Sequence, residues 1–307
     1  MTSVAVVTNR KKVNASASDA LRKALTNAGF GDARWYEAKG GSAATPATEC
    51  ALADGANVVI AAGGDGTVRG CAHALAGTDA ALAVMPTGTA NLFASALDLP
   101  SDADAVVELL TSGAVRTLDV GVCNGMRFVV MAGSGFDASL MKAVDDGPKD
   151  RFGTLAYVWA GLREVRRREP LNVRVTVDGS RFYNGLATCV LVGNLGRLKA
   201  GVFAFPEASP VDGRLEVGVV SASTAMQWLG VAGRVLLRRP QASRRVQLGS
   251  GSTIDVEWAP KAAGRTKKRA RKMPYELDGG AKGSARKLHY ACEPRSLRVL
   301  VPAEAGR

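Results

Sequence analysis

Apolar runs alternate with amphipathic helical patterns over the N-terminal part of the chain. The runs at 4–8, 58–62 and 80–85 are almost wholly apolar, as in strands that are buried on both faces. After the first run, a helical pattern begins at Ser18, a residue type favoured as N-cap, and ends at Gly29. This alternation of strand and helix predicts an α/β domain with a doubly wound parallel sheet.

The pattern changes near Leu118, beyond a further predicted helix that Ser101 caps and Gly113 closes. Short alternating runs then dominate, and Asn-Gly at 124–125 and Asp-Gly at 178–179 are typical of tight hairpin turns. Helical patterns at 154–168 and 224–239 interrupt these runs. We therefore predict a β-rich second domain that is an antiparallel sandwich.

The second predicted strand of the α/β domain leads directly into a glycine-rich turn that holds one carboxylate. The turn is Gly63-Gly64-Asp65-Gly66-Thr67, and a helical pattern follows it. Glycines permit positive φ and a close approach of backbone N–H groups to a polyphosphate. The N-terminus of the following helix would also attract an anion. A structural alternative is that Asp65 merely caps that helix.

A second strand–turn–helix unit follows, with the turn at 86–91 containing Gly88, Thr89 and Asn91. Open α/β sheets bind ligands at the carboxyl ends of neighbouring strands. The combination Gly-Gly-Asp-Gly-Thr and then Gly-Thr-Ala-Asn resembles the catalytic domain of the diacylglycerol kinase and sphingosine kinase superfamily, in particular its bacterial lipid kinase branch.

The resemblance implies ATP and Mg²⁺ as cofactors. The candidate groups for the phosphates are the backbone amides of 63–67 and 88–91, with side-chain donors from Thr67, Thr89 and Asn91. Asn9 matches the residue that opens the family's first phosphate loop, but the segment 10–12 is Arg-Lys-Lys in place of the usual Pro, Ser and Gly.

Phosphoryl transfer requires charge neutralisation, an aligned acceptor oxygen and a group that takes its proton. Asp65 could bind magnesium or take that proton. The family's later Asp-Gly-Glu is here Asp278-Gly279-Gly280, so a carboxylate of the family's catalytic machinery is missing. One possibility is that Asp65 carries the base role alone, with the carboxylate of Asp278 or Glu276 reaching into the site. The other is that phosphoryl transfer is much reduced.

The segment 193–215 resembles the family's substrate-domain signature. The resemblance implies a structural Mg²⁺ at Asp212, with the backbone carbonyls of Ser209 and Arg214 as further ligands. An Asp before Gly is otherwise typical of a simple turn. In the family the last strand returns to the first domain, and the segment 294–302 resembles it. The predicted domains are therefore 1–118, completed by 292–307, for the nucleotide, and 119–291 for the lipid.

The formal charge of +12 indicates an anionic partner. The segment 261–272 carries seven basic residues and no acid, and a second basic cluster lies at 163–168. No aromatic residue is interleaved and no groove-reading motif is present, so nucleic acid is not expected. Each basic residue near an anionic bilayer gains about 1 kcal/mol, which favours a membrane surface, although a solvated loop is the alternative.

The sequence also bears on the location and the oligomeric state of the protein. No window approaches the ~20 apolar residues of a membrane span, and the N-terminal order of charge and apolar residues is wrong for a signal peptide. We expect a cytoplasmic protein that associates peripherally with membranes, and a homodimer remains open. Five scattered cysteines and two histidines indicate neither a disulfide framework nor a zinc site.

The predicted function is an ATP-dependent lipid kinase that transfers the γ-phosphoryl group to a hydroxyl of a diacylglycerol-like lipid. One alternative is a nucleotide- and lipid-binding regulator that has weak catalysis, because Gly280 replaces the family's Glu. An NAD kinase-type enzyme shares Gly-Gly-Asp-Gly-Thr, but the chain lacks the later Asn-Glu pair and the Thr-Pro-Thr-Gly-Ser-Thr-like segment of those enzymes.

Overall fold

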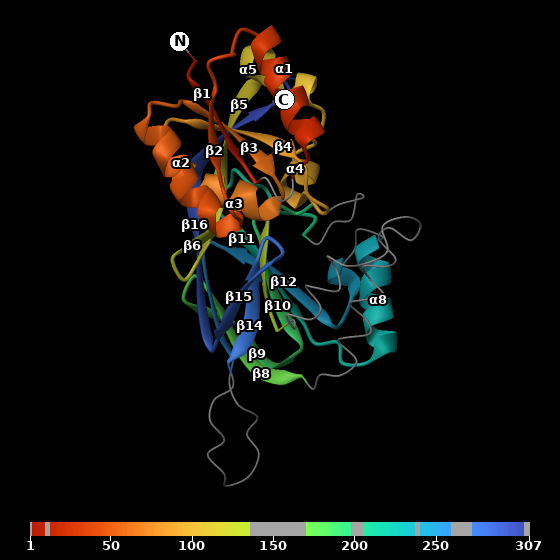
Figure 1. Cartoon of the computed structure of the whole chain (residues 1–307). Helices are drawn as coiled ribbons and strands as arrows, with labels where there is room; N and C mark the ends of the chain where they lie inside the picture. Colours follow the sequence, from red (N-terminus) through yellow and green to blue (C-terminus); the bar gives the residue numbers. More distant parts are fainter. Residues whose placement is uncertain are drawn as a thin grey trace. The chain divides into compact units, whose positions relative to one another are not determined.

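The computed structural model describes residues 2–9, 13–135, 170–197, 205–236, 240–258 and 272–303 (Figure 1). The chain forms two compact units. Unit 1 contains the residues up to Val120, then Arg127–Val129, and the chain from Glu293 onward. Unit 2 contains Gly121–Met126 and Val130–Cys292.

Parallel strands form the centre of unit 1. They are β1 (Val4–Thr8), β2 (Arg34–Glu37), β3 (Val58–Gly63) and β4 (Ala81–Pro86). Their order is β2-β1-β3-β4, and the last part of β16 (Lys287–Val301) pairs in parallel with β4, with Arg298 opposite Ala81. The predicted parallel sheet is confirmed, and so is the pairing of the last strand with it.

Helices cover both faces of this sheet (Figure 1). They are α1 (Ala15–Asn27), α2 (Ala44–Ala53), α3 (Asp65–Leu75), α4 (Leu92–Ala96) and α5 (Ala103–Ser112), with a 3₁₀ turn η1 (Gly41–Ala43) before α2. Alternate strand residues such as Val6 and Ile60 join the apolar faces of α1 and α5 in one core, while α2 and α3 pack together and contact β1 and β3. The sheet is therefore doubly wound, as predicted.

The helix N-caps differ from the predicted ones. Asn14, not Ser18, caps α1 by accepting the N–H of Ala17 at 2.7 Å. Asp102, not Ser101, caps α5. Each true cap lies where the chain leaves the extended conformation, and several nearby residue types could serve equally by sequence. Gly29 ends α1 as expected, with φ of 85°.

Unit 2 is a β-sandwich. One antiparallel sheet has the order β12-β11-β10-β7-β14-β15, and in the other β13 pairs with β8 and with the first part of β16, while β9 pairs with β8. Trp258 links the two sheets, because its indole N–H donates to the Ser134 hydroxyl at 3.2 Å. The predicted sandwich is confirmed.

The elements between residues 114 and 285 lie mainly in unit 2, and β5 and β6 lie partly in unit 1. They are β5 (Ala114–Cys123), β6 (Met126–Phe128), β7 (Met131–Ser134), β8 (Leu171–Val177), β9 (Ser180–Ala187), β10 (Cys189–Gly193), β11 (Leu215–Val220), α8 (Ala225–Leu236), η3 (Pro240–Ala242), β12 (Val246–Gly251), β13 (Thr253–Trp258), β14 (Met273–Leu277) and β15 (Gly280–Ala285). Asn124 and Asp178 both have positive φ in the predicted hairpin turns. The predicted helix at 154–168, residues 10–12 and the basic run up to Arg271 lie outside the described residues.

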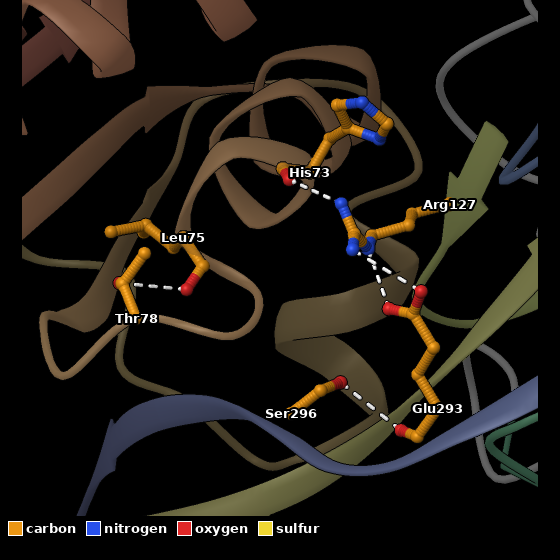
Figure 2. A network of polar contacts seen from close by, with 6 residues as sticks. All are labelled: His73, Leu75, Thr78, Arg127, Glu293 and Ser296. Carbon is orange, nitrogen blue, oxygen red and sulfur yellow. Dashed lines mark hydrogen bonds and ion pairs between the residues drawn. The ribbon is translucent and has the colours of Figure 1, made fainter. Parts of the chain in front are cut away.

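An arginine fixes the C-terminal end of α3 (Figure 2). The guanidinium of Arg127 donates to both carboxylate oxygens of Glu293, at 2.6 and 3.2 Å, and to the carbonyl of His73 at 3.0 Å. His73 lies in the last turn of α3, where a positive charge is favourable. Because α3 begins at Asp65, this bidentate ion pair helps to hold in place the helix that carries the candidate site.

Candidate functional site

Three strand ends of unit 1 lie side by side. Thr8 at the end of β1 is in register with Ala62, and Gly63 at the end of β3 is in register with Pro86. The N–H of Thr87 donates to the carbonyl of Gly63 at 3.0 Å. The predicted residue Asn9, the first glycine turn and the second glycine turn are therefore gathered at one edge of the sheet, where parallel sheets bind ligands.

The glycines are needed for close packing, and not for positive φ. Neither Gly63 nor Gly88 has positive φ, and Gly64 is extended with φ of −93°. A Cβ on Gly63 would overlap the Thr67 side chain, and one on Gly88 would lie 2.6 Å from the Cα of Gly64. The expected left-handed turn is thus wrong. The two glycine turns instead touch backbone to backbone, which only glycine permits.

Several groups that were predicted to bind phosphate are engaged within the turns. The Asn91 side chain accepts the N–H of Gly88 at 2.9 Å and donates to its carbonyl at 2.8 Å, from a residue with φ of 47°. The N–H of Thr67 donates to the Gly64 carbonyl, and Thr67 is only 2% exposed. Thr89 is exposed. Their ligand-binding roles stay predictions, and in this conformation Asn91 and Thr67 shape the turns.

Asp65 connects the two turns. Gly64 is the N-cap of α3, so Asp65 lies inside the first turn of that helix, and its Oδ1 accepts the N–H of Leu92 at 2.6 Å. The expected alternative, in which Asp65 merely caps α3, is not what the structure shows. The carboxylate instead lies at the start of α4, the helix that follows the second turn.

The environment of Asp65 shifts its proton affinity. Burial raises the pKa of the Asp65 carboxyl above its ordinary value, while the backbone amides of Leu92 and Phe93 act in the opposite direction. A carboxylate with a raised pKa is a stronger base once it is ionised. Perturbed carboxyl groups of this kind are concentrated at functional sites. Asp65 can therefore take a proton or contribute an oxygen to a hard cation.

Sequence reasoning missed two hydroxyl groups at this edge. Within the described part of the chain, the Thr8 and Thr87 hydroxyls are buried without a hydrogen-bond partner. An unpaired buried polar group costs about 1–3 kcal/mol, so such groups are rarely retained without a reason. Thr8 and Thr87 each follow an apolar run at a strand end, which is the signal that could have identified them. The strand-end glycines, orphaned hydroxyls and amides at the start of α3 fit a phosphate-bearing nucleotide.

Asp278 and Gly280 lie in unit 2, in the hairpin between β14 and β15. Asp278 is 3% exposed and its Oδ1 accepts the N–H groups of Val130 and Met131, at 2.8 and 3.1 Å. These bonds tie the hairpin to β7, which is a structural use of the carboxylate, and its catalytic role stays a prediction. Glu276 accepts the N–H of Gly279, and Gly280 pairs with Leu277.

The Asp212 loop offers oxygen ligands to a cation. Asp212 is exposed and accepts the N–H of Arg214 at 3.0 Å in a tight turn. The pKa of nearby Glu216 is raised by burial and then by the negative charges of Asp212 and Glu207. No group of three or more Asp, Glu, His or Cys side chains among the described residues is arranged to hold a metal ion. A cation here would thus need backbone oxygens such as that of Ser209, a donor set that Mg²⁺ accepts.

Two family models match the chain. Residues 3–123 match the diacylglycerol kinase catalytic domain, and residues 130–301 match the YegS C-terminal NAD kinase beta sandwich-like domain. A protein of Pseudomonas aeruginosa named "Probable lipid kinase YegS-like" is 31% identical over 264 residues, which cover 83% of this chain and 80% of that protein. The chain belongs to the diacylglycerol kinase superfamily, in its bacterial lipid kinase branch.

Other proteins are also similar to this chain in sequence or in fold. A diacylglycerol kinase of Bacillus subtilis is 30% identical over 200 residues, covering 62% of this chain and 64% of that enzyme. An uncharacterized protein of Synechocystis is 30% identical over 84% of this chain, which spans only 58% of that relative's length. The crystal structure of a diacylglycerol kinase from Bacillus anthracis has the same fold, with a TM-score of 0.72 at 22% identity, covering 98% of this chain and 97% of that one.

Proposed function

We propose that the protein is an ATP- and Mg²⁺-dependent lipid kinase that transfers the γ-phosphoryl group to a hydroxyl of a diacylglycerol-like lipid. The observation that carries this proposal is the bond from the Leu92 N–H to Asp65, which joins two glycine turns at one sheet edge. Family membership supports the reaction class, and the relatives' names support lipid as the acceptor.

Backbone and side-chain groups of the two glycine turns in unit 1 each have a role in this proposal. Backbone amides at the start of α3 would face the phosphates, as helix N-termini do in other nucleotide sites, whereas that of Thr67 donates to the Gly64 carbonyl. Gly63 and Gly88 let the two turns approach closely. Asp65 would take the proton of the acceptor hydroxyl, or supply one oxygen to the metal. Bound Mg²⁺ would neutralise charge on the phosphates.

In unit 2, Asp212 would hold a second, structural Mg²⁺ together with the backbone oxygens of Ser209 and Arg214. The support is the pair of negative charges at Asp212 and Glu207, which add to burial in raising the pKa of Glu216, while Arg214 acts in the opposite direction. A bound cation would offset this repulsion and stabilise the loop that precedes β11.

A second candidate function is a nucleotide- and lipid-binding regulator with weak catalysis. It is favoured by one specific observation, namely that a glycine occupies position 280, where the family carries a glutamate. General-base help is typically worth about 10²–10⁴-fold in rate, so the replacement could lower turnover strongly without affecting nucleotide binding.

The test is turnover of radiolabelled ATP with a panel of lipids, namely diacylglycerol, sphingoid bases and other lipid alcohols, and with NAD as the non-lipid acceptor. Label in a diacylglycerol-like product is the expected result. Label in NAD alone would contradict the proposal. ATP and lipid binding without label transfer to any acceptor would favour the regulator.

The place of action is proposed to be an anionic membrane surface that the protein binds from the cytoplasm. No helix in the described ranges combines the length and the apolar character that crossing a bilayer demands. The net charge of +12 and the basic run at 261–272 support contact with anionic lipid. Replacing the basic residues of this run with Ser should weaken binding to anionic vesicles. Unchanged binding would contradict a membrane role for the run.

A further inference from the structure

Helix α8 of unit 2 has few polar residues, and among the described residues its apolar packing partners lie on one side. Of its residues 225–236, only Gln227 and Arg234 are polar. Trp228, Val231 and Val235 pack against the sandwich. Their partners are Cys189, Val220, Ala222 and Val246. Gln227 and Arg234 are seven residues apart and therefore share one side of the helix, beside the packed side.

In the part of the chain that the structure describes, the opposite face of α8 is exposed. Met226 and Leu229 are 79% and 52% exposed, the two highest values among the large hydrophobic residues that the structure describes. Gly233 lies on the same face, and a Cβ there would meet nothing within 4 Å. Successive helical residues are rotated by about 100°, which places these three residues within one stripe opposite Trp228, Val231 and Val235. In Figure 1, α8 lies along the outside of the strands of unit 2.

The chain segment that contains α8 carries only positive charge. The segment 217–254 contains no acidic residue and five arginines. Arg234 is exposed, and its guanidinium folds back to donate to the carbonyl of Gly230 at 2.9 Å, so that it lies along the helix surface. Arg244 and Arg245 follow the helix and are also exposed.

We propose that the outer face of α8 is a membrane-contact surface that inserts Met226 and Leu229 among the lipids of an anionic bilayer. Charge complementarity selects this occupant, because exposed arginines on and just after a helix with exposed apolar side chains fit anionic headgroups and acyl chains. A second copy of the chain would bring the same arginines face to face. The inference deepens the proposed lipid kinase function by naming the element that contacts the membrane, and it does not depend on the basic run at 261–272.

The first experiment is cosedimentation of the full chain with phosphatidylcholine vesicles, with and without phosphatidylglycerol, in the absence of ATP. Met226→Ser/Leu229→Ser should lower the partition coefficient on phosphatidylglycerol vesicles about tenfold. The matched control is Val115→Ser/Leu186→Ser, which removes apolar side chains that are 47% and 48% exposed elsewhere. The control should bind as the parent does. Unchanged circular dichroism and thermal unfolding would show that both variants are folded.

The second experiment separates charge from apolar insertion. Arg244→Gln/Arg245→Gln should weaken binding to phosphatidylglycerol vesicles about tenfold and should leave the weak binding to pure phosphatidylcholine unchanged. A tryptophan introduced by Met226→Trp should be quenched by lipids with brominated acyl chains more strongly than one introduced by Leu186→Trp. Equal quenching at the two positions would overturn the proposal.

Two further outcomes would also overturn it. One is equal vesicle binding by the parent and by Met226→Ser/Leu229→Ser. The other is a parent that sediments as a dimer and a Met226→Ser/Leu229→Ser variant that sediments as a monomer but binds vesicles as the parent does. The stripe would then be an interface between copies of the chain. Vesicle binding is measured without ATP, so absent kinase activity with intact, α8-dependent binding would count against the proposed function alone.

Discussion

The Oδ1 of Asp65 lies 2.6 Å from the backbone nitrogen of Leu92, 27 residues further along the chain. This single contact joins the first turn of α3 to the first turn of α4, and so fixes one glycine turn against the other. Because the acceptor is a carboxylate, the same group that positions the second turn also places a titratable oxygen at the sheet edge.

Asp65→Asn should lose most phosphoryl transfer and keep the fold. The amide oxygen can still accept the Leu92 N–H, whereas the charge that binds metal or takes a proton is gone. Asp65→Ala is the companion variant, and it should also lose stability, by about 1–3 kcal/mol, because the Leu92 N–H is left unpaired. Lipid kinase turnover and urea unfolding measure the two effects. A purified Asp65→Asn variant with near-parental turnover would refute the catalytic role.

The pH dependence of Asp65 follows from its raised pKa. Below the ordinary value of 3.8 the group is protonated in both the folded and unfolded states. Between 3.8 and the raised folded-state pKa it ionises more readily when unfolded, so its contribution to stability falls as pH rises through this window. The free energy of unfolding of the parent relative to Asp65→Asn should decrease accordingly. Turnover should rise with pH across the same range, and a flat profile there would contradict base catalysis by Asp65.

Gly88→Ala should destabilise the protein and disturb ATP binding. The new Cβ would lie 2.6 Å from the Cα of Gly64 and 2.8 Å from Oδ1 of Asn91, so a backbone segment must move. Overpacking of this kind typically costs about 1–3 kcal/mol. The matched control is Gly233→Ala, where a Cβ meets no atom within 4 Å and alanine favours the helix. Thermal unfolding should separate the two variants, and equal stabilities would show that the turns do not depend on this contact.

Gly280→Glu should raise lipid kinase turnover about tenfold or more if position 280 faces the transferred group, given what general-base help is worth. Gly280 does not have positive φ, so a glutamate can adopt its backbone conformation without left-handed strain. The control is Gly280→Gln, which has nearly the same size and no charge. Suppose that both variants fold and bind ATP as the parent does. Equal turnover in the glutamate and glutamine variants would then contradict a base role at position 280, and Glu276 and Asp278 would be the next carboxylates to replace.

Mg²⁺ should raise the unfolding temperature of the parent more than that of Asp212→Asn. A ligand that binds only the folded state stabilises it by mass action, and about 2.7 kcal/mol is expected at one hundred times the dissociation constant. Asp19→Asn is the control, because Asp19 is an exposed carboxylate in unit 1. An equal rise in unfolding temperature on adding Mg²⁺ to the parent and to Asp212→Asn would contradict metal binding by Asp212.

Much of the fold could be predicted because the central strands β1 and β3 of unit 1 are buried on both faces. Each residue of β1 and of β3 is buried, which produces uninterrupted apolar runs. The sequence gives little strand signal over β12, because it contains three polar or glycine positions in succession, with only Val246 and Leu248 as large apolar residues. The N-caps were misplaced by one to four residues, since capping depends on where the backbone turns and not on residue type alone.

The site was predicted only in part, for a related reason. The positions of Gly63, Asp65 and Gly88 follow from local sequence, because strand ends and glycines are local signals. The bond from Leu92 to Asp65 and the packing of Gly88 on Gly64 join segments that are distant in sequence, and no periodic pattern encodes them. The buried hydroxyl of Thr8 was overlooked because a threonine fits a strand equally well for its shape.

The ion pair between Arg127 and Glu293 also affects the order of events during protein synthesis. Glu293 and the parallel part of β16 emerge from the ribosome after unit 2 has been made. Domains generally fold as units while the chain grows, N-terminal part first. Unit 1 cannot finish folding before unit 2 is translated, because its last strand and the partner of Arg127 follow all of unit 2 in the chain. A nascent chain stalled before Glu293 should therefore have an open edge at β4, where chaperones could bind.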